Sequence, residues 1–143
     1  MKALFIPLLL LFTNIAAAQT TSIEVNISNV RDEVGQMVVS LYLSTDSFPM
    51  KPHKFYEVEK KGQVTNGNMS YTIENVPVGK YAIVLLDDNN RNLDMDRKMF
   101  GIPKEGYGFS NDAKPKMLTP PDFEACSFEA QEPVSVQITT VYW

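Results

Sequence analysis

Oxygen-bearing side chains recur at alternate positions between residues 88 and 96, directly after a strongly apolar stretch. With Asp88 as position one of a calcium-binding loop, positions three, five, seven and nine are Asn90, Asn92, Asp94 and Asp96. Hard cations such as Ca²⁺ bind several oxygen ligands, and alternate residues of a tight loop can direct their oxygens to one centre. The spacing therefore predicts a calcium site, to which Asp94 contributes its backbone carbonyl.

Two positions of this loop differ from a helical EF-hand. Leu93 stands at position six, where the EF-hand has Gly, and Met99 stands at position twelve, where it has a bidentate Glu. A ligand from elsewhere, Glu105 or Asp87, is then needed, and we expect weak affinity. An alternative stays open: Asp and Asn side chains also hydrogen-bond their own backbone, so the same run can be a turn that binds no metal.

A second candidate site follows from Gly101 to Asn111, where glycine, proline and aromatic residues alternate. In one interpretation Tyr107 and Phe109 form a stacking surface for a ligand, with Lys104 and Glu105 as polar contacts. In the other, which we favour, the aromatic rings fold back and cap one end of the domain, because an irregular loop must bury something to stay ordered. Gly106 and Gly108 are expected to supply unusual φ angles.

The elements that must position these loops are short strands. Apolar and polar residues alternate with a period of two, which is typical of half-buried strands. The stretch 80–86 is apolar on both faces, which indicates a central strand. We predict an all-β antiparallel sandwich of about seven strands, immunoglobulin-like or transthyretin-like, without an amphipathic helix of ten residues. The expected strands are 23–28, 37–44, 55–61, 69–74, 80–86, a strand containing Cys126 and Phe128, and 134–140.

The N-terminus has the pattern of a secretory signal peptide. Lys2 supplies the positive charge, an apolar run follows, and small residues precede a cleavage site near Ala18. The run is too short to span a membrane as a helix. We therefore predict a signal peptide over 1–18 and one β-sandwich domain over 19–143, without a membrane span, in the periplasm or secreted.

Composition excludes some functions. The formal net charge is −4 at pH 7, which argues against nucleic-acid binding, since that requires a basic face. Cys126 is the only cysteine, so the chain can form no internal disulfide, and we interpret this residue as a small buried hydrophobe. His53 is the only histidine and is expected in an exposed loop.

The segments LLDDNNRNLDMD and GIPKEGYGFSN, with VPVGKYA upstream, resemble the bacterial family called domain of unknown function 2141. Asp88, Asn90, Asn92 and Asp96 match the oxygen-bearing positions of its first motif, and Gly101 to Asn111 match its second motif. Leu93 stands where the family usually has Gly, and Asp87 where it often has His. The resemblance implies an exported β-sandwich and names no activity.

The function expected from these observations is that of a non-enzymatic binding or structural module of the cell envelope, stabilised by calcium in the 88–96 loop. Its partner would be a protein or glycan of the envelope, and no other cofactor is expected. One alternative is a carbohydrate-binding module that uses the 101–111 loop and requires the rings of Tyr107, Phe109 and Trp143 to be exposed. A less favoured alternative is a hydrolase that uses carboxylates of Asp88, Asp96 or Glu105.

Overall fold

The computed structural model describes residues 17–44, 46–116 and 118–143. The predicted signal peptide therefore lies almost wholly outside the described residues. Within the described part of the chain, no helix has the length and apolar character needed to cross a membrane.

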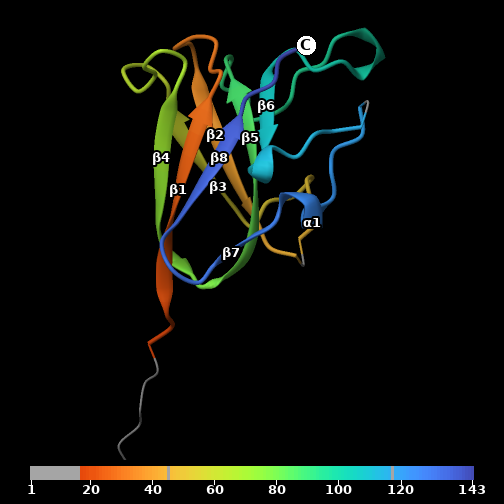
Figure 1. Cartoon of the computed structure of the whole chain (residues 1–143). Helices are drawn as coiled ribbons and strands as arrows, with labels where there is room; N and C mark the ends of the chain where they lie inside the picture. The colour runs from red at the N-terminus through yellow and green to blue at the C-terminus, as the bar shows by residue number, and fades with distance from the viewer. Residues whose placement is uncertain (1–16, 45, 117) are drawn as a thin grey trace, which may run out of the picture.

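Eight strands form two sheets that face one another (Figure 1). The smaller sheet has the order β4–β1–β8, with β1 at Thr20–Ser28, β4 at Met69–Pro77 and β8 at Val134–Thr139. The larger sheet has the order β3–β2–β5–β6, and β7 pairs with β5. Its strands are β2 at Gln36–Tyr42, β3 at Lys54–Glu59, β5 at Gly79–Asp88, β6 at Gly106–Phe109 and β7 at Phe128–Ala130. The prediction of a β-sandwich is thus confirmed at the level of two packed sheets.

The expectation of antiparallel pairing throughout is wrong at one edge. β1 and β8 run parallel, with Ile23 opposite Val134 and Ile27 opposite Ile138. The chain pairs through β7 with the larger sheet and then enters β8 in the smaller one, so β8 is not part of a hairpin with β1. Parallel strands need such a crossover connection, whereas adjacent hairpin strands do not.

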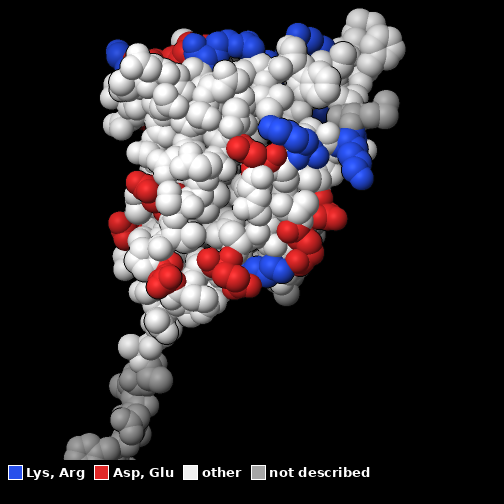
Figure 2. Space-filling view, viewed as in Figure 1, with Lys and Arg blue, Asp and Glu red and all other residues white. Residues whose placement is uncertain are grey.

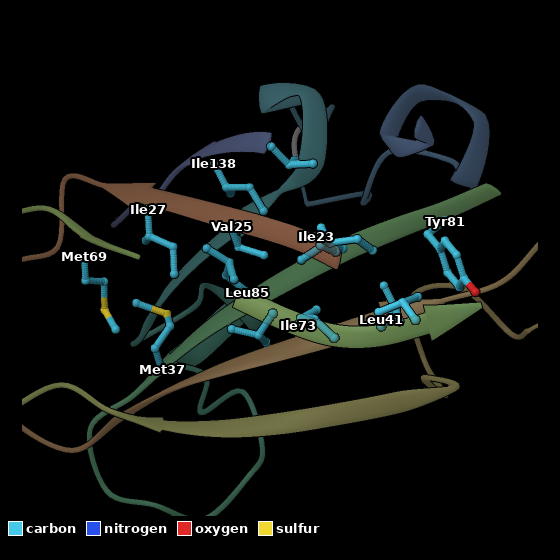
Figure 3. Packing of buried hydrophobic residues seen from close by; sticks show 14 of the residues in the cluster. Ile23, Val25, Ile27, Met37, Leu41, Met69, Ile73, Tyr81, Leu85 and Ile138 are labelled. Carbon is cyan, nitrogen blue, oxygen red and sulfur yellow. The ribbon is translucent and has the colours of Figure 1, made fainter. Parts of the chain in front are cut away.

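The main core lies between the two sheets and follows from the alternation of each strand (Figure 3). In β1, Ile23, Val25 and Ile27 are at most 1% exposed, while the residues between them face outward. Side chains of β2 and β5 pack against them from the other sheet. The inward residues of those two strands are Met37, Val39, Leu41, Tyr81, Ile83 and Leu85.

A second apolar cluster lies on the other face of the larger sheet. Tyr42, Ala82, Tyr107, Phe109 and Cys126 are buried there, because β2 and β5 are apolar on both faces. The cluster is covered by loops and by a short helix, α1, at Phe123–Cys126. Cys126 was expected in a strand and instead ends this helix, whose first turn is capped by the Asp122 carboxylate accepting from the backbone N of Ala125 at 2.8 Å.

Strand β6 lies inside the segment that was expected to be a loop. Its glycines, Gly106 and Gly108, were expected to supply unusual φ angles, and they do not. Neither Gly106 nor Gly108 has a positive φ. A Cβ on Gly106 would lie 2.4 Å from the ring of Tyr142, and one on Gly108 would lie 2.6 Å from Cγ2 of Ile138. Both positions therefore require Gly because β6 packs directly against the C-terminal segment, not because the backbone turns there.

Candidate functional site

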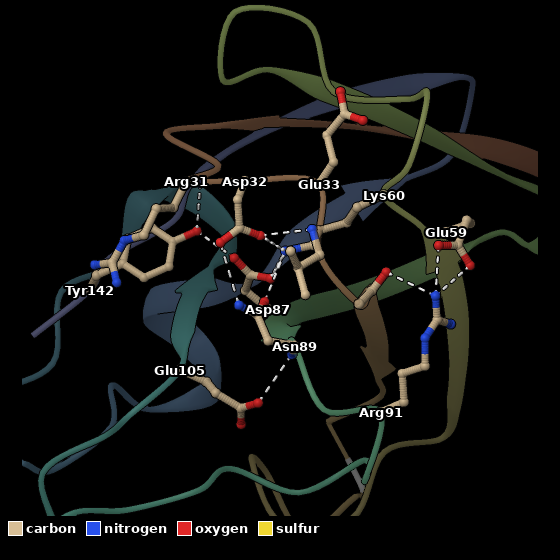
Figure 4. Close-up of polar contacts among 12 residues, drawn as sticks. Arg31, Asp32, Glu33, Glu59, Lys60, Asp87, Asn89, Arg91, Glu105 and Tyr142 are labelled. Carbon is tan, nitrogen blue, oxygen red and sulfur yellow. Dashed lines mark hydrogen bonds and ion pairs between the residues drawn. The ribbon is translucent and has the colours of Figure 1, made fainter.

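The end of β5 enters a buried network of charged and polar groups (Figure 4). The Lys60 ammonium is completely buried and donates to the Asp87 carboxylate, which is itself 1% exposed. Lys60 also donates to Asp32 at 3.1 Å and to Asn89 Oδ1 at 3.0 Å. The Tyr142 hydroxyl donates to the second oxygen of Asp87 at 2.5 Å. The network joins four separate segments of the chain at one point.

The hydrogen bonds of this network hold its four chain segments in place. Burial, together with the hydrogen bond to Asp87, raises the pKa of Tyr142 above its usual value, so its hydroxyl stays protonated. The backbone N of Arg31 donates to that hydroxyl at 3.0 Å, and the Arg31 guanidinium lies 4.0 Å from the ring centroid. Lys60 and Asp87 are enclosed by these partners, and we assign them a structural role beneath the 88–96 loop.

The first residue of the predicted calcium loop is also enclosed. Asp88 is fully buried, and its carboxylate accepts from the backbone N of Asn92 at 3.1 Å and of Leu93 at 3.0 Å. The Gln36 side chain donates to it at 2.9 Å. Leu93, which stands at the position where an EF-hand has Gly, has a φ of 62°. The backbone therefore keeps the left-handed conformation at this position although the residue is branched.

Three other residues of the loop turn their head groups towards one another. Asn90 Nδ2 lies 2.6 Å from one carboxylate oxygen of Asp96, and Asn92 Nδ2 lies 3.2 Å from the other. The amide oxygens of Asn90 and Asn92 accept from the backbone N of Asn92 and Asp94. The Asp94 side chain is exposed and lies apart, at the groove described below. The structure thus brings together four of the five predicted ligand residues around an Asx-type turn.

Glu105 braces this loop from below. Its two carboxylate oxygens accept from the backbone N of Asn89 at 3.1 Å and of Asp96 at 3.2 Å. Burial raises the pKa of Glu105, against the opposing effect of these two hydrogen bonds. Lys104 beside it is exposed. In the described ranges 17–44, 46–116 and 118–143, no group of three His, Cys, Asp or Glu side chains is arranged to hold a metal ion.

A groove of about 510 Å³ lies over the outer face of the larger sheet. Its floor is formed by outward-facing residues of β2, β5 and β6, and its walls by three connecting segments. The floor residues are Val38, Ser40, Tyr42, Val84, Leu86, Tyr107 and Phe109. The walls contain Pro49, Met50 and Pro52 from one segment, Leu93, Met95, Arg97 and Pro103 from the second, and Pro115, Leu118 and Pro120 from the third.

The rings of the 101–111 segment do not form an exposed platform. Tyr107 is 8% exposed and Phe109 is 7% exposed, and the two rings make an edge contact with centroids 5.9 Å apart. Trp143 is 56% exposed, but its Nε1 donates to the Tyr107 hydroxyl at 2.7 Å. The alternative with exposed rings is therefore wrong for Tyr107 and Phe109, whereas the favoured interpretation of buried rings agrees with the structure, because β6 pairs with Val84 to Asp87 of β5. Both residues line the groove.

The sequence reasoning missed most of the groove. Val38 and Ser40 of β2, and Val84 and Leu86 of β5, were not singled out as site residues. A signal was present, because β5 is apolar on both faces and β2 runs Met-Val-Val without alternation. A strand that is apolar on both faces needs other residues to pack against each of them. Here the connecting segments cover the outer face of β2 and β5 only in part, which leaves the groove.

Comparison with known proteins bears on the family alone. No curated protein and no solved structure matches the chain. One family model, described as "Uncharacterized protein conserved in bacteria (DUF2141)", matches residues 25–138 and so spans nearly the whole sandwich, from β1 to β8. The match includes Asp32, Lys60 and Asp87 of the buried network, the 88–96 loop and the floor of the groove, whereas Tyr142 lies beyond it. The chain therefore belongs to this bacterial family, DUF2141.

Proposed function

We propose that this chain is an exported, non-enzymatic binding module of the cell envelope, and that its ligand lies in the groove over the larger sheet. The observation that carries the proposal is the groove itself, a concavity of about 510 Å³ on a rigid sheet face. Sites for small molecules are concave, largely apolar and within this range of volume. Export rests on the signal-peptide pattern at 1–18, and the finer likeness to immunoglobulin or transthyretin sandwiches belongs to the same proposal.

The lining selects for an apolar ligand with a small polar part. Aliphatic, aromatic and proline side chains make up most of the lining, and Ser40, Asp94 and Arg97 add polar groups to it. Burial of apolar surface would supply the affinity, and the few polar groups would fix the orientation of the ligand. A protein or glycan of the envelope could present such a group to the groove.

The proposal can be tested with Nile red, whose fluorescence rises in apolar sites. Ser40 is half-buried on the floor, so Ser40→Trp should fill the groove and remove dye binding by the mature protein. Ser70→Trp, on an exposed position of β4, is the matched control and should leave binding unchanged. Equal dye binding by both variants would refute the groove as the ligand site.

Calcium in the 88–96 loop is a second proposal, favoured by one observation. The side-chain amides of Asn90 and Asn92 converge on the Asp96 carboxylate, at 2.6 and 3.2 Å from its two oxygens. Carboxylate and amide oxygens of this kind suit Ca²⁺. Because the amide nitrogens now point at Asp96, binding would require both amides to rotate, and we expect affinity in the millimolar range.

The two alternatives have less support. Carbohydrate binding through the 101–111 segment would rely on ring faces that are buried in β6, and only Trp143 offers a largely open ring. Hydrolysis would rely on Asp88 and Glu105, which are at most 8% exposed and accept hydrogen bonds from backbone amides. Binding of soluble glycans that Trp143→Ala abolishes would support the first, and turnover lost in Glu105→Gln would support the second.

A further inference from the structure

The connection between β5 and β6 contains a protruding turn with two exposed apolar side chains. Met99 is 78% exposed and Phe100 is 86% exposed, which places both almost entirely in water. The turn projects from the end of the sandwich that also holds the C-terminus (Figure 1). Apolar groups grouped at a protruding tip are uncommon on a protein surface without an interaction that covers them.

The backbone holds this tip in a defined shape. The backbone N of Lys98 donates to the carbonyl of Ile102 at 2.7 Å, and that of Gly101 donates to the carbonyl of Lys98 at 3.2 Å. The Arg97 guanidinium donates to the Gly101 carbonyl at 2.9 Å. The apolar tip, defined as residues 98–101, is therefore a braced turn.

Phe100 adopts a strained backbone conformation, and its ring is exposed. Its φ is 64°, in the left-handed region, which is unfavourable for a bulky aromatic residue. Such strain is retained at functional sites when the surroundings enforce it. The ring of Phe100 is 86% exposed, so packing of the ring does not offset the cost of the strained backbone. Folding stability alone gives no reason for Phe at this position.

Basic residues surround the tip. Arg97, Lys98 and Lys104 lie within eight consecutive residues that contain no carboxylate. Within the residues that the structure describes, none of these three forms an ion pair. Figure 2 shows most of the Lys and Arg side chains of the visible face in its upper part, with some acidic side chains among them, and most of the Asp and Glu side chains lower down.

We infer that the apolar tip docks the protein peripherally onto an anionic lipid surface. Met99 and Phe100 enter the boundary between headgroups and acyl chains, and the ammonium of Lys98, the guanidinium of Arg97 and the ammonium of Lys104 contact lipid phosphates. Apolar side chains flanked by basic ones match the two layers of such a surface. A protein partner fits less well, because a stable protein interface buries far more area than a four-residue tip provides.

The inference shares only Arg97 with the groove, because Lys98, Met99, Phe100 and Lys104 do not line it. It can be tested by co-sedimentation of the mature protein with vesicles of phosphatidylcholine, with and without phosphatidylglycerol. We expect binding to the vesicles with phosphatidylglycerol only, weakening as salt rises. Phe100→Ser should weaken it by about tenfold, and Lys98→Gln by about fivefold.

Matched controls keep the test specific. Val34→Ser removes another exposed apolar side chain, 58% exposed, and Lys61→Gln removes another exposed lysine. Both should bind vesicles like the unchanged protein, and Nile red binding should be the same in all four variants. No binding to anionic vesicles, or equal loss in control and tip variants, would overturn the inference. Vesicle-independent pelleting or dimerisation that Phe100→Ser abolishes would also overturn it, in favour of a protein partner.

Emission of Phe100→Trp gives a second readout. A tryptophan at this tip should shift its emission to the blue when anionic vesicles are added, because the indole leaves water. The native Trp143 is the reference, measured in the unchanged protein. An unshifted emission from position 100 under conditions where the protein binds vesicles would show that another surface makes the contact.

Discussion

The ammonium of Lys60 lies against the carboxylate of Asp87 with both groups closed off from solvent. Lys60 follows β3 and Asp87 lies near the end of β5, so the pair ties two strands that are not neighbours in the larger sheet. The Lys60 ammonium also donates hydrogen bonds to the side chains of Asp32 and Asn89 (Figure 4). The 88–96 loop begins directly beyond this pair, so its position depends on the pair remaining intact.

Replacing Lys60 should destabilise the protein strongly. Lys60→Met leaves Asp87 buried without its cation, and breaking one partner of a buried ion pair costs about 3–5 kcal/mol. Urea unfolding of the mature protein measures the free energy. Lys61→Met, at the exposed neighbour, is the control and should change stability by no more than about 0.5 kcal/mol. A loss below about 1 kcal/mol for Lys60→Met would show that Asp87 is not held as a buried charge.

The Tyr142 hydroxyl should make stability fall in alkali. Because its pKa is raised by burial in the folded protein, the unfolded chain loses this proton first, and stability falls as pH rises above the ordinary value of 10.0. Tyr142→Phe should cost about 1–3 kcal/mol at neutral pH through the lost hydrogen bond to Asp87. The difference in unfolding temperature between the two proteins should then narrow at alkaline pH. A difference that stays constant with pH would contradict the assignment, since the Tyr142 hydroxyl is the group that the two proteins do not share.

Gly108 should tolerate no side chain. A Cβ there would lie 2.6 Å from Cγ2 of Ile138 and 3.1 Å from the carbonyl oxygen of Thr139. Gly108→Ala should therefore cost about 1–3 kcal/mol by overpacking β6 against β8. Gly79→Ala in β5 is the control, because its Cβ would meet nothing closer than 3.6 Å. Equal thermal stability of the two variants would contradict the close packing of β6.

Leu93 should be replaceable by Gly with a gain in stability. Its φ of 62° is unfavourable for a branched residue, and glycine removes that cost. Since glycine also increases the entropy of the unfolded chain, the net gain should be about 0.5–1 kcal/mol. Asp94→Gly in the same loop, without a positive φ, should instead lose a similar amount. Chemical denaturation measures the free energy of unfolding of both variants. A lower stability of Leu93→Gly would show that the side chain of Leu93 stabilises the protein through its contacts at the groove.

Calcium should stabilise the 88–96 loop if its head groups rearrange around the ion. A ligand that binds only the folded state raises stability by mass action, by about 1.4 kcal/mol at tenfold above its dissociation constant. We expect millimolar Ca²⁺, but not Mg²⁺, to raise the unfolding temperature relative to EDTA. Asp96→Asn should abolish the shift, and Asp94→Asn, whose side chain lies outside the cluster, should keep it. Identical thermal unfolding curves in Ca²⁺ and in EDTA would show that the loop binds no calcium and is held by its hydrogen bonds alone.

Several features of the fold could be predicted because they are local. The alternation of Ile23, Val25 and Ile27 sets one buried face whatever the strand pairs with. Likewise, the hydrogen bonds from Asn92 and Leu93 to Asp88 join residues four and five positions apart, which an Asx-rich run indicates directly. The family motifs cover the same loop and the following segment.

Other features depend on partners that are distant in sequence, and only the tertiary structure decided them. Tyr142 and Asp87 are 55 positions apart, and Lys60 and Asp87 are 27 apart, so no periodicity links them. Strand β6 is too short and glycine-rich to show alternation, and it exists because β5 and the C-terminal segment enclose it. Local patterns in the sequence were enough to predict the inward face of the strands and the Asx turn as one of two interpretations of the 88–96 loop. The tertiary structure decided which strands meet, which charges are buried together, and that Tyr107 and Phe109 form the floor of a groove, because these follow from packing across the whole chain.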